Sequence, residues 1–203
     1  MISIVNYGLG NLKSVLNMIN KIGGQATIET NPKVLDHADK IILPGVGAFD
    51  YSMSNLNKNG WINALNEAVL ARKVPVLGIC LGMQLMCKSS EEGIIPGLGW
   101  IDADVKKFNY PLDSNFKIPH MGWNTVNIKK SNPLITDKEN EQRFYFVHSY
   151  HVVCNNMKDI LTTSHHGYEI TSAFSHNNIY GVQFHPEKSH RFGMALLKKF
   201  IEM

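Results

Sequence analysis

The stretch VPVLGICLGMQ, residues 74–84, constrains the fold more than any other part of the chain. It begins as a continuous apolar run, which is typical of a strand covered on both faces of a parallel sheet. Cys80 then stands between Gly78 and Gly82, and residues 81–93 beyond it have the composition of a helix. Glycines around one reactive residue at a strand-to-helix junction indicate a turn too sharp for large neighbours. We therefore expect a buried strand that ends in a tight turn at Cys80.

The N-terminal half of the chain alternates between two patterns. Apolar residues at helical spacing predict helices over 9–23 and over most of 53–72. Strand-like runs cover 2–8, 25–30 and 39–49. Strands that alternate with helices indicate an α/β fold whose sheet is parallel and covered on both faces.

The pattern changes in the C-terminal half, where strand-like runs follow one another with little helix between them. These runs cover 99–108, 120–128, 143–153, 169–176 and 179–185. HNNI at 176–179 predicts a hairpin turn, and residues 190–203 predict a closing amphipathic helix. The predicted fold class is α/β, with a central, largely parallel sheet flanked by helices and additional antiparallel strands in the C-terminal half. We expect a single domain over 1–203.

Composition excludes several classes of function. The formal net charge of the 203 residues is only +3, and no run of Lys and Arg exceeds two residues, so we expect no nucleic-acid partner. No apolar run approaches the length of a membrane span, so we expect no membrane association. Cys80, Cys87 and Cys154 are odd in number and lack CxxC spacing, which favours reduced thiols and a cytoplasmic protein.

Cys80 is the candidate nucleophile. A helix that starts near Leu81 would lower the pKa of the thiol through its N-terminal dipole, and the Leu81 N–H could stabilise an oxyanion. The alternative is a buried structural cysteine in a tight turn. A nucleophilic cysteine also needs a base, and GVQFHPEKSH at 181–190 supplies His185 with Glu187 two residues later. The alternative for this pair is a strand-end histidine and a surface glutamate.

Other motifs give weaker indications. LPGVGAF at 43–49 allows a loop whose backbone N–H groups could provide a second oxyanion donor, or it is a routine turn. The pair His148 and His151 does not have the spacing of a helical zinc site, and in a strand the two side chains would point to opposite faces. His185 and His190 likewise lack that spacing, so we expect no metal site.

Taken together, these motifs resemble the class I, or triad, glutamine amidotransferases over the whole chain. The Cys–His–Glu triad of that family falls on Cys80, His185 and Glu187. Within the family, the chain is most similar to the glutaminase subunits of imidazole glycerol phosphate synthase. That similarity is carried by NYGLGNLKSV at 6–15, LPGVGAF at 43–49, IPHMGWN at 118–124, FYFVHSY at 144–150 and HPEKS at 185–189.

The resemblance implies a glutaminase that releases glutamate and ammonia without a cofactor or metal. It implies that Cys80 attacks glutamine while His185 gives a proton to the leaving ammonia. The residues that it implies for the oxyanion and for glutamine binding are Gly45, Val46, Gly47, Leu81, Gln84, Glu92, Ser149 and Tyr150.

The resemblance also implies a heterodimer in which ammonia passes to a (β/α)₈-barrel synthase, or cyclase, that makes imidazole glycerol phosphate in histidine biosynthesis. The positions implied for partner contact and coupling are Asn11, Trp123, Tyr145 and Lys188. The tail HRFGM at 190–194 is instead similar to paralogues that supply ammonia to a sugar-modifying synthase in surface-polysaccharide biosynthesis. Two readings of other classes stay open: a catalytically silent regulatory subunit, and a related cysteine peptidase or hydrolase.

Overall fold

A mixed β-sheet forms the centre of the protein. The computed structural model describes residues 1–111, 113–136 and 141–203, and the sheet has twelve strands within these ranges. Its main path runs through β2 (Ala26–Glu29), β1 (Ile2–Val5), β3 (Lys40–Gly45), β4 (Val76–Cys80), β12 (Ile179–Val182), β11 (Tyr168–His176), β10 (Ile160–His166), β7 (His120–Ile128) and β8 (Gln142–His148). Off this path, β5 (Ser89–Ser90) pairs with β6 (Ala103–Lys107), and β9 (Tyr150–Cys154) pairs with β6 and β11.

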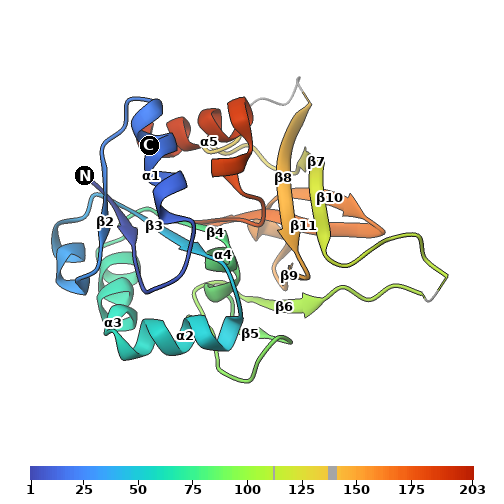
Figure 1. Ribbon diagram of the computed structural model, residues 1–203, viewed down its shortest axis with the longest axis horizontal. Helices are drawn as coiled ribbons and strands as arrows, with labels where there is room; N and C mark the ends of the chain where they lie inside the picture. Colours follow the sequence, from blue (N-terminus) through green and yellow to red (C-terminus); the bar gives the residue numbers. More distant parts are fainter. Residues whose placement is uncertain (112, 137–140) are drawn as a thin grey trace.

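The sheet is parallel in one half and antiparallel in the other. Each pairing from β2 through β1, β3 and β4 to β12 is parallel. From β12 onward, through β11, β10, β7 and β8, each pairing is antiparallel. In Figure 1 the antiparallel strands lie to the right of the parallel ones. The predicted fold class is confirmed by this arrangement.

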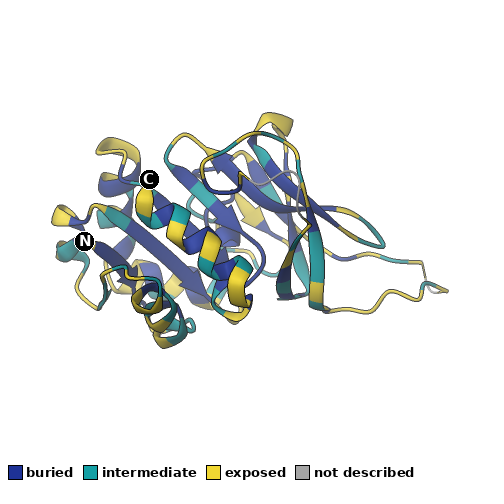
Figure 2. Cartoon of the chain, turned by 90° about the horizontal axis from the view of Figure 1, so that it is seen from above, coloured by how far each residue is buried: buried dark blue, intermediate teal, exposed yellow. Residues whose placement is uncertain are grey.

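Helices cover both faces of the parallel half. Figure 1 shows α1 (Leu12–Lys21) and α5 (His190–Glu202) above the sheet, and α2 (Phe49–Lys58) and α3 (Trp61–Asn66) below it. Successive residues of a strand point to opposite faces. In β3, Ile41 and Leu43 accordingly join the core between the sheet and α2 and α3. Ile42 joins the core between the sheet and α1 and α5. The central strands β1, β3 and β4 are buried almost throughout and are dark blue in Figure 2, while α5 alternates between buried and exposed residues.

Three segments differ in detail from the sequence prediction. The helical segment 53–72 is interrupted at Gly60, whose φ is 73°. The helix after Cys80, α4 (Leu81–Leu85), has only five residues, because the chain enters β5 at Ser89. Strand β10 was not predicted, because its sequence ILTTSHH lacks an apolar pattern; its buried hydroxyls are instead satisfied by partners such as Ser172, which lies 2.7 Å from Thr162. The hairpin turn at 176–179 is confirmed, since His176 pairs with Ile179.

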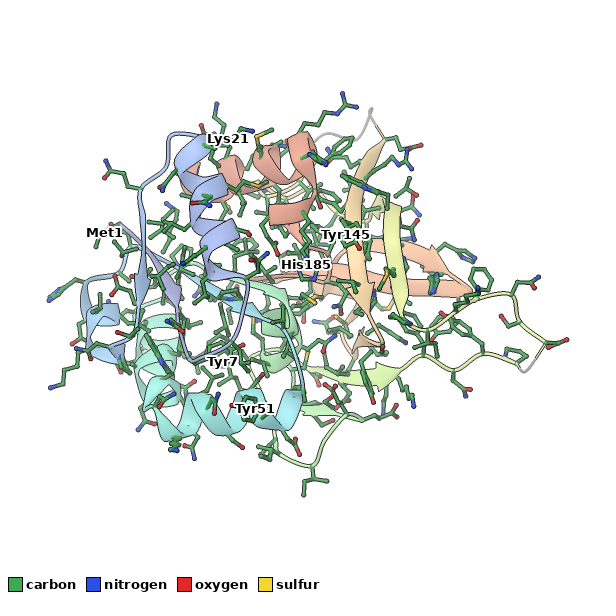
Figure 3. All side chains as sticks on the ribbon, in the orientation of Figure 1. Met1, Tyr7, Lys21, Tyr51, Tyr145 and His185 are labelled. Atoms are coloured by element: carbon green, nitrogen blue, oxygen red, sulfur yellow. The ribbon has the colours of Figure 1, made fainter. Side chains whose placement is uncertain are left out.

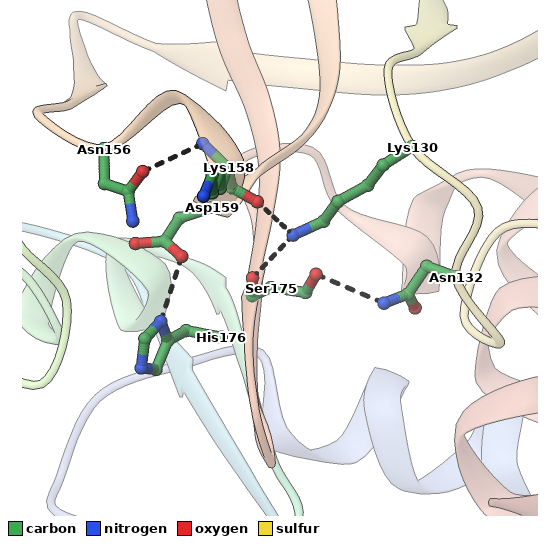
Figure 4. A network of polar contacts seen from close by, with 7 residues as sticks. All are labelled: Lys130, Asn132, Asn156, Lys158, Asp159, Ser175 and His176. Carbon is green, nitrogen blue, oxygen red and sulfur yellow. Dashed lines mark hydrogen bonds and ion pairs between the residues drawn. The ribbon is translucent and has the colours of Figure 1, made fainter.

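A polar network ties the turns of the antiparallel half together (Figure 4). The Lys130 ammonium group, just after β7, donates to the carbonyl oxygens of Lys158 at 2.6 Å and Ser175 at 2.8 Å. Next to it, the His176 ring contacts the Asp159 carboxylate at 2.9 Å. The Lys130 side chain thus joins the segment after β7 to the turn before β10 and to β11.

Within the described ranges, none of the helices combines the length and the apolar composition of a membrane span.

The turn after β4 packs so closely against the sheet that two residues around it have no space for a side chain. A Cβ atom at Gly82 would lie 1.8 Å from the Leu43 carbonyl oxygen, and one at Gly78 would lie 2.8 Å from the backbone of Gly82. Both clashes are with main-chain atoms, which cannot move aside as a flexible side chain can. Gly78 and Gly82 are therefore required by the close approach of α4 to the sheet.

We expect Gly82→Ala to destabilise the protein by about 3 kcal/mol, because the added methyl group overpacks the turn against backbone. Gly60→Ala is the matched control: its Cβ would meet no atom within 4 Å, so it should cost only the left-handed backbone penalty, about 1 kcal/mol. Urea unfolding of the two variants measures the difference. Equal losses would contradict the packing argument.

Candidate active site

Cys80 is the last residue of β4 and immediately precedes α4. Its backbone is held at φ 55° and ψ −111°, a conformation that non-glycine residues rarely adopt and that often marks a functional residue. The side chain is nearly buried, and the Gln183 side-chain amide donates to its sulfur at 3.8 Å. The first N–H groups of α4 have no partner in a preceding helical turn, as at any helix N-terminus.

His185 and Glu187 form a hydrogen-bonded pair next to this turn. The His185 Nδ1–H donates to the Glu187 carboxylate at 2.8 Å, and both side chains are almost completely buried. Within the described ranges the other ring nitrogen, Nε2, is buried and has no hydrogen-bond partner. Because Glu187 holds the proton at Nδ1, Nε2 is the nitrogen that is available to accept or donate a proton.

The backbone holds this pair in place. The His185 N–H donates to the carbonyl oxygen of Tyr145 in β8 at 2.9 Å, and the Ser189 hydroxyl donates to the His185 carbonyl oxygen at 2.6 Å. The same hydroxyl oxygen accepts the Tyr145 N–H at 3.0 Å. Figure 3 shows His185 and Tyr145 side by side where the two halves of the sheet meet. The ring is thus tied to the antiparallel half, although it follows a parallel strand.

The charge state of His185 depends on its two neighbours. Burial by itself lowers the pKa of the imidazole, because it penalises the charged ring. The sulfur of Cys80 and the carboxylate of Glu187 act in the opposite direction and together raise the pKa to about 10. An imidazolium can therefore persist at neutral pH next to Cys80, and a cationic neighbour of this kind is what a cysteine nucleophile requires.

A cavity of about 360 Å³ opens in front of Cys80. Its lining combines residues from both halves of the sheet: Val46, Gly47, Cys80, Leu81, Gln84, Glu92, Pro119, Val147, His148, Ser149, Tyr150, His185 and Lys188. Most of the residues expected at the site meet here. Two residues of the expected oxyanion, glutamine-binding and triad sets do not line the cavity. Gly45 pairs with Cys80 at the end of β3, and Glu187 is hydrogen-bonded to His185.

Two polar side chains of the lining are held in fixed positions. The Glu92 carboxylate accepts the Phe49 N–H at 3.0 Å, and burial is the main cause that raises its pKa. The Gln84 amide donates both to the Tyr150 carbonyl oxygen and to the Gln183 side chain, at 3.0 Å each. The cavity lining therefore includes a carboxylate and an amide whose positions are both fixed by hydrogen bonds.

Three of the four positions expected to contact a partner form one cluster beside the cavity. The Lys188 ammonium lies 5.8 Å from the centroid of the Tyr145 ring, and the Trp123 and Tyr145 rings are 6.5 Å apart. Trp123 also stacks on His190 at 5.7 Å and is 40% exposed. Asn11 lies outside this cluster, at the start of α1.

Sequence reasoning missed several residues of the site. Gln183, fully buried and bonded to the Cys80 sulfur, lies two residues before His185, and the two-residue period of a strand could have indicated it.

The expectation that His148 and His151 point to opposite faces is wrong. The chain bends at Ser149 between β8 and β9, so both rings pack on Phe108, with centroids 5.2 and 4.9 Å away. In the described ranges no three or more His, Cys, Asp or Glu residues are grouped so that they could hold a metal ion.

Comparison with known proteins decides the family. The profile of the family described as "Glutamine amidotransferase class-I" matches residues 3–203. The chain belongs to the class I glutamine amidotransferases. The amidotransferase is 54% identical over 202 residues to "Imidazole glycerol phosphate synthase subunit HisH 2" of Methanococcus maripaludis, covering 100% of this chain and 99% of that protein. It is 46% identical to the protein of the same name from Pseudomonas aeruginosa, with 100% of each covered.

A solved structure supports the fold of this amidotransferase independently. "Structure of PurLQS from Thermotoga maritima" superposes with a TM-score of 0.76 at 16% sequence identity, covering 99% of this chain and 97% of that chain. At this identity the match concerns the fold alone. The recognition of the family from its motifs, and with it the assignment to the glutamine amidotransferases, is confirmed.

The three thiols of the amidotransferase should differ in reactivity. Burial raises the pKa of Cys87 well above its usual range and that of Cys154 to about 11, so both stay protonated at pH 8. We expect iodoacetamide and a glutamine-like electrophile to label Cys80 and to spare the other two, as measured by peptide mass spectrometry. Cys80→Ser should abolish labelling. Modification of Cys87 in the folded protein would be the contrary result.

Proposed function

We propose that this amidotransferase is the glutaminase subunit of an imidazole glycerol phosphate synthase, and that Cys80, His185 and Glu187 are its catalytic triad. The observation that carries the proposal is the geometry of the pair opposite Cys80: a buried imidazole whose Nδ1 is held by a carboxylate and whose Nε2 has no hydrogen-bond partner among the described residues. Full-length relatives that carry the name of this synthase subunit support the substrate and the pathway.

In the first half of the reaction, the Cys80 thiolate attacks the side-chain carbonyl carbon of glutamine. The electron pair of the C=O bond moves onto oxygen, and the oxyanion is stabilised by the Leu81 N–H and by a backbone donor from Gly45, Val46 or Gly47. As the intermediate collapses, the C–N bond breaks and the His185 Nε2–H gives its proton to the leaving nitrogen. Ammonia departs, and a γ-glutamyl thioester on Cys80 remains.

In the second half, water attacks the thioester. The neutral His185 takes a proton from the water at Nε2, and the C–S bond breaks, so that glutamate leaves and the thiolate–imidazolium pair is restored. Glu187 stays ionised throughout and keeps the ring oriented, as an orienting carboxylate does in other triads.

The lining of the cavity fits the polar ends of glutamine. Glu92 provides the negative charge that an α-ammonium group requires, and the bend at Ser149 and Tyr150 provides backbone groups for the α-carboxylate. Gln84 lies between the two and holds the Tyr150 carbonyl oxygen. These assignments place the amide of glutamine toward Cys80.

The partner in this proposal is a (β/α)₈-barrel synthase that receives ammonia directly. Trp123, Tyr145 and Lys188 form a partly exposed cluster at the mouth of the cavity, where Met121 is also 62% exposed. Exposed aromatic and apolar side chains beside a polar cavity are typical of a protein interface. Asn11, at the start of α1, adds to the same face in the proposal. The three free thiols fit a reducing, cytoplasmic compartment.

A different acceptor for the ammonia is the alternative within this proposal. Two observations favour it: both relatives named above carry the number 2 in their names, and the tail at 190–194 is similar to that of the polysaccharide paralogues. In that case the ammonia would go to a sugar-modifying synthase in surface-polysaccharide biosynthesis. The triad and the glutaminase half-reaction would be unchanged.

The triad should behave as one unit. We expect Cys80→Ala and His185→Ala each to lower glutaminase kcat by roughly 10⁴ to 10⁶-fold, and Glu187→Gln to lower it less, because Glu187 only orients the ring. The double variant Cys80→Ala/His185→Ala should lose little more than either single variant. Losses that multiply would contradict a shared mechanism, and turnover that none of the variants lowers would reject the triad. A wild-type chain that releases no ammonia from glutamine, alone or with a synthase, would favour a catalytically silent subunit.

The loop Gly45, Val46 and Gly47 should couple turnover to the partner. Gly47 has φ 101°, so the peptide groups beside it can reorient at little cost, and a donor turned away from the oxyanion would cost about 2.7–4 kcal/mol, or roughly 10² to 10³ in rate. We expect the isolated subunit to hydrolyse glutamine slowly and a liganded synthase to accelerate it by that order. Steady-state turnover alone, with the histidine-pathway barrel and with a sugar-modifying synthase measures the effect and identifies the acceptor. Equal turnover in every mixture would reject the gating.

A further inference from the structure

A chain of hydrogen bonds between side chains runs from β7 to the wall of the cavity. The Asn124 amide nitrogen lies 3.1 Å from His120 Nε2, and His120 Nδ1 lies 2.9 Å from His148 Nε2. The chain ends at the Tyr150 carbonyl oxygen, 2.7 Å from His148 Nδ1. His120 and His148 are 4% and 6% exposed, so water does not compete for these contacts.

The direction of every bond in this chain follows from its last member. A carbonyl oxygen only accepts, so His148 carries a proton on Nδ1 and its Nε2 must accept when the ring is neutral. His120 therefore donates from Nδ1 and accepts at Nε2, where the Asn124 amide donates. Both rings are thus in the neutral Nδ1–H tautomer.

A second set of bonds leads from the same carbonyl to the nucleophile. Tyr150 O also accepts the Gln84 amide at 3.0 Å, and that amide donates to Gln183 at 3.0 Å. Gln183 in turn donates to the Cys80 sulfur at 3.8 Å. The Tyr150 carbonyl is therefore the point at which support from β7 and β8 meets the residues around the thiol.

We propose that His120 and His148 are positioning residues, a fixed neutral relay that holds the Tyr150 carbonyl and with it the Ser149–Tyr150 wall of the glutamine cavity. His120 does not line the cavity, so it acts through His148. The role in glutamine binding rests on the glutaminase function proposed above. The relay itself is a property of the folded chain.

The surroundings of the two rings keep them uncharged. His120 stacks on His166 of β10, with centroids 4.1 Å apart, and on Phe146 at 4.6 Å. Burial and, after it, the nearby imidazole of His166 lower the pKa of His120 to about 4. Burial also lowers the pKa of His148 well below its usual range, although the hydrogen bond to the Tyr150 carbonyl oxygen acts in the opposite direction. The other titratable groups around His148 are His151 of β9 and, across the cavity, Cys80, Glu92, His185 and Lys188.

The network cannot easily absorb an added proton. A proton on His148 Nε2 would face the Nδ1–H of His120, and His120 would have to move its own proton to Nε2, toward the Asn124 amide nitrogen. Asn124 is fixed in its orientation, because its nitrogen also donates to the His165 carbonyl oxygen at 2.9 Å and its oxygen accepts the Thr125 N–H at 2.8 Å. Since both folded pKa values lie below 6.5, the relay stabilises the fold above about pH 6.5, and this contribution is lost as pH falls through the folded values.

The tautomers can be measured without any assay of activity. Nitrogen-15 NMR of the wild-type chain, labelled in its histidine rings, distinguishes Nδ1–H, Nε2–H and imidazolium forms. We expect His120 and His148 to be Nδ1–H tautomers at pH 7 and to stay neutral at pH 5.5. An Nε2–H tautomer or an imidazolium at either position at pH 7 would overturn the relay.

The positioning role is tested by a set of three variants. His120→Phe removes the donor to His148 and should raise KM for glutamine about tenfold, with kcat changed less than about threefold. His120→Gln can donate from Nε2 and accept at Oε1, so it should restore KM to within about threefold of wild type. His166→Phe, which keeps a ring stacked on His120, is the matched control and should leave both constants unchanged.

The outcomes separate this inference from the proposed function. An unchanged KM in His120→Phe, or a tenfold increase that His120→Gln does not reverse, would reject the positioning role even if glutamine is hydrolysed. If the wild-type chain releases no ammonia, the glutaminase proposal fails. The dissociation constant for glutamine, from NMR titration of the same variants, then replaces KM in the comparison.

Discussion

The parallel pairing of β4 between β3 and β12 is the interaction on which the rest of the site depends. It sets Gly45 opposite Cys80 and Val182 opposite Ile79, so that the carboxyl ends of three strands reach the same edge of the sheet. Ligand sites in open α/β sheets lie outside such ends. The nucleophile, the glycine loop and the segment that carries the imidazole are neighbours for this reason, although more than 100 residues separate Cys80 from His185 in the chain.

The strained backbone at Cys80 persists because the surrounding packing allows no other backbone conformation there. Residues of β4 are buried on both faces, and α4 lies so close to β3 that only glycine fits at position 82. A conformation of this kind costs of order 1–3 kcal/mol and persists only where neighbouring contacts determine it. Here the core on both faces of the sheet provides those contacts, and Cys80 lines the cavity.

The two halves of the sheet contribute different residues to the site. The parallel half positions Cys80 and Leu81, whereas the antiparallel half supplies the wall at Val147, His148, Ser149 and Tyr150. The His185 segment links them, because its N–H is bonded to β8 while its strand, β12, is paired with β4. A movement of β7 and β8, the strands that carry Trp123 and Tyr145, would therefore reach the imidazole and the cavity wall together. This is the route by which the partner in the proposed function would act on turnover.

The α/β class, the tight turn at Cys80, the pairing of His185 with Glu187 and the family could all be predicted from the chain, because each depends on local pattern or on a short motif. Which of the nine histidines support the site depends instead on how distant segments pack together. His148 and His151 are three residues apart in a stretch that looks like one strand, and a bend at Ser149 puts both on one aromatic cluster. The links from Asn124 to Tyr150 and from Gln183 to Cys80 join segments that are distant in the chain, and hydrogen bonds of that kind depend on strand order and register, which no local pattern contains.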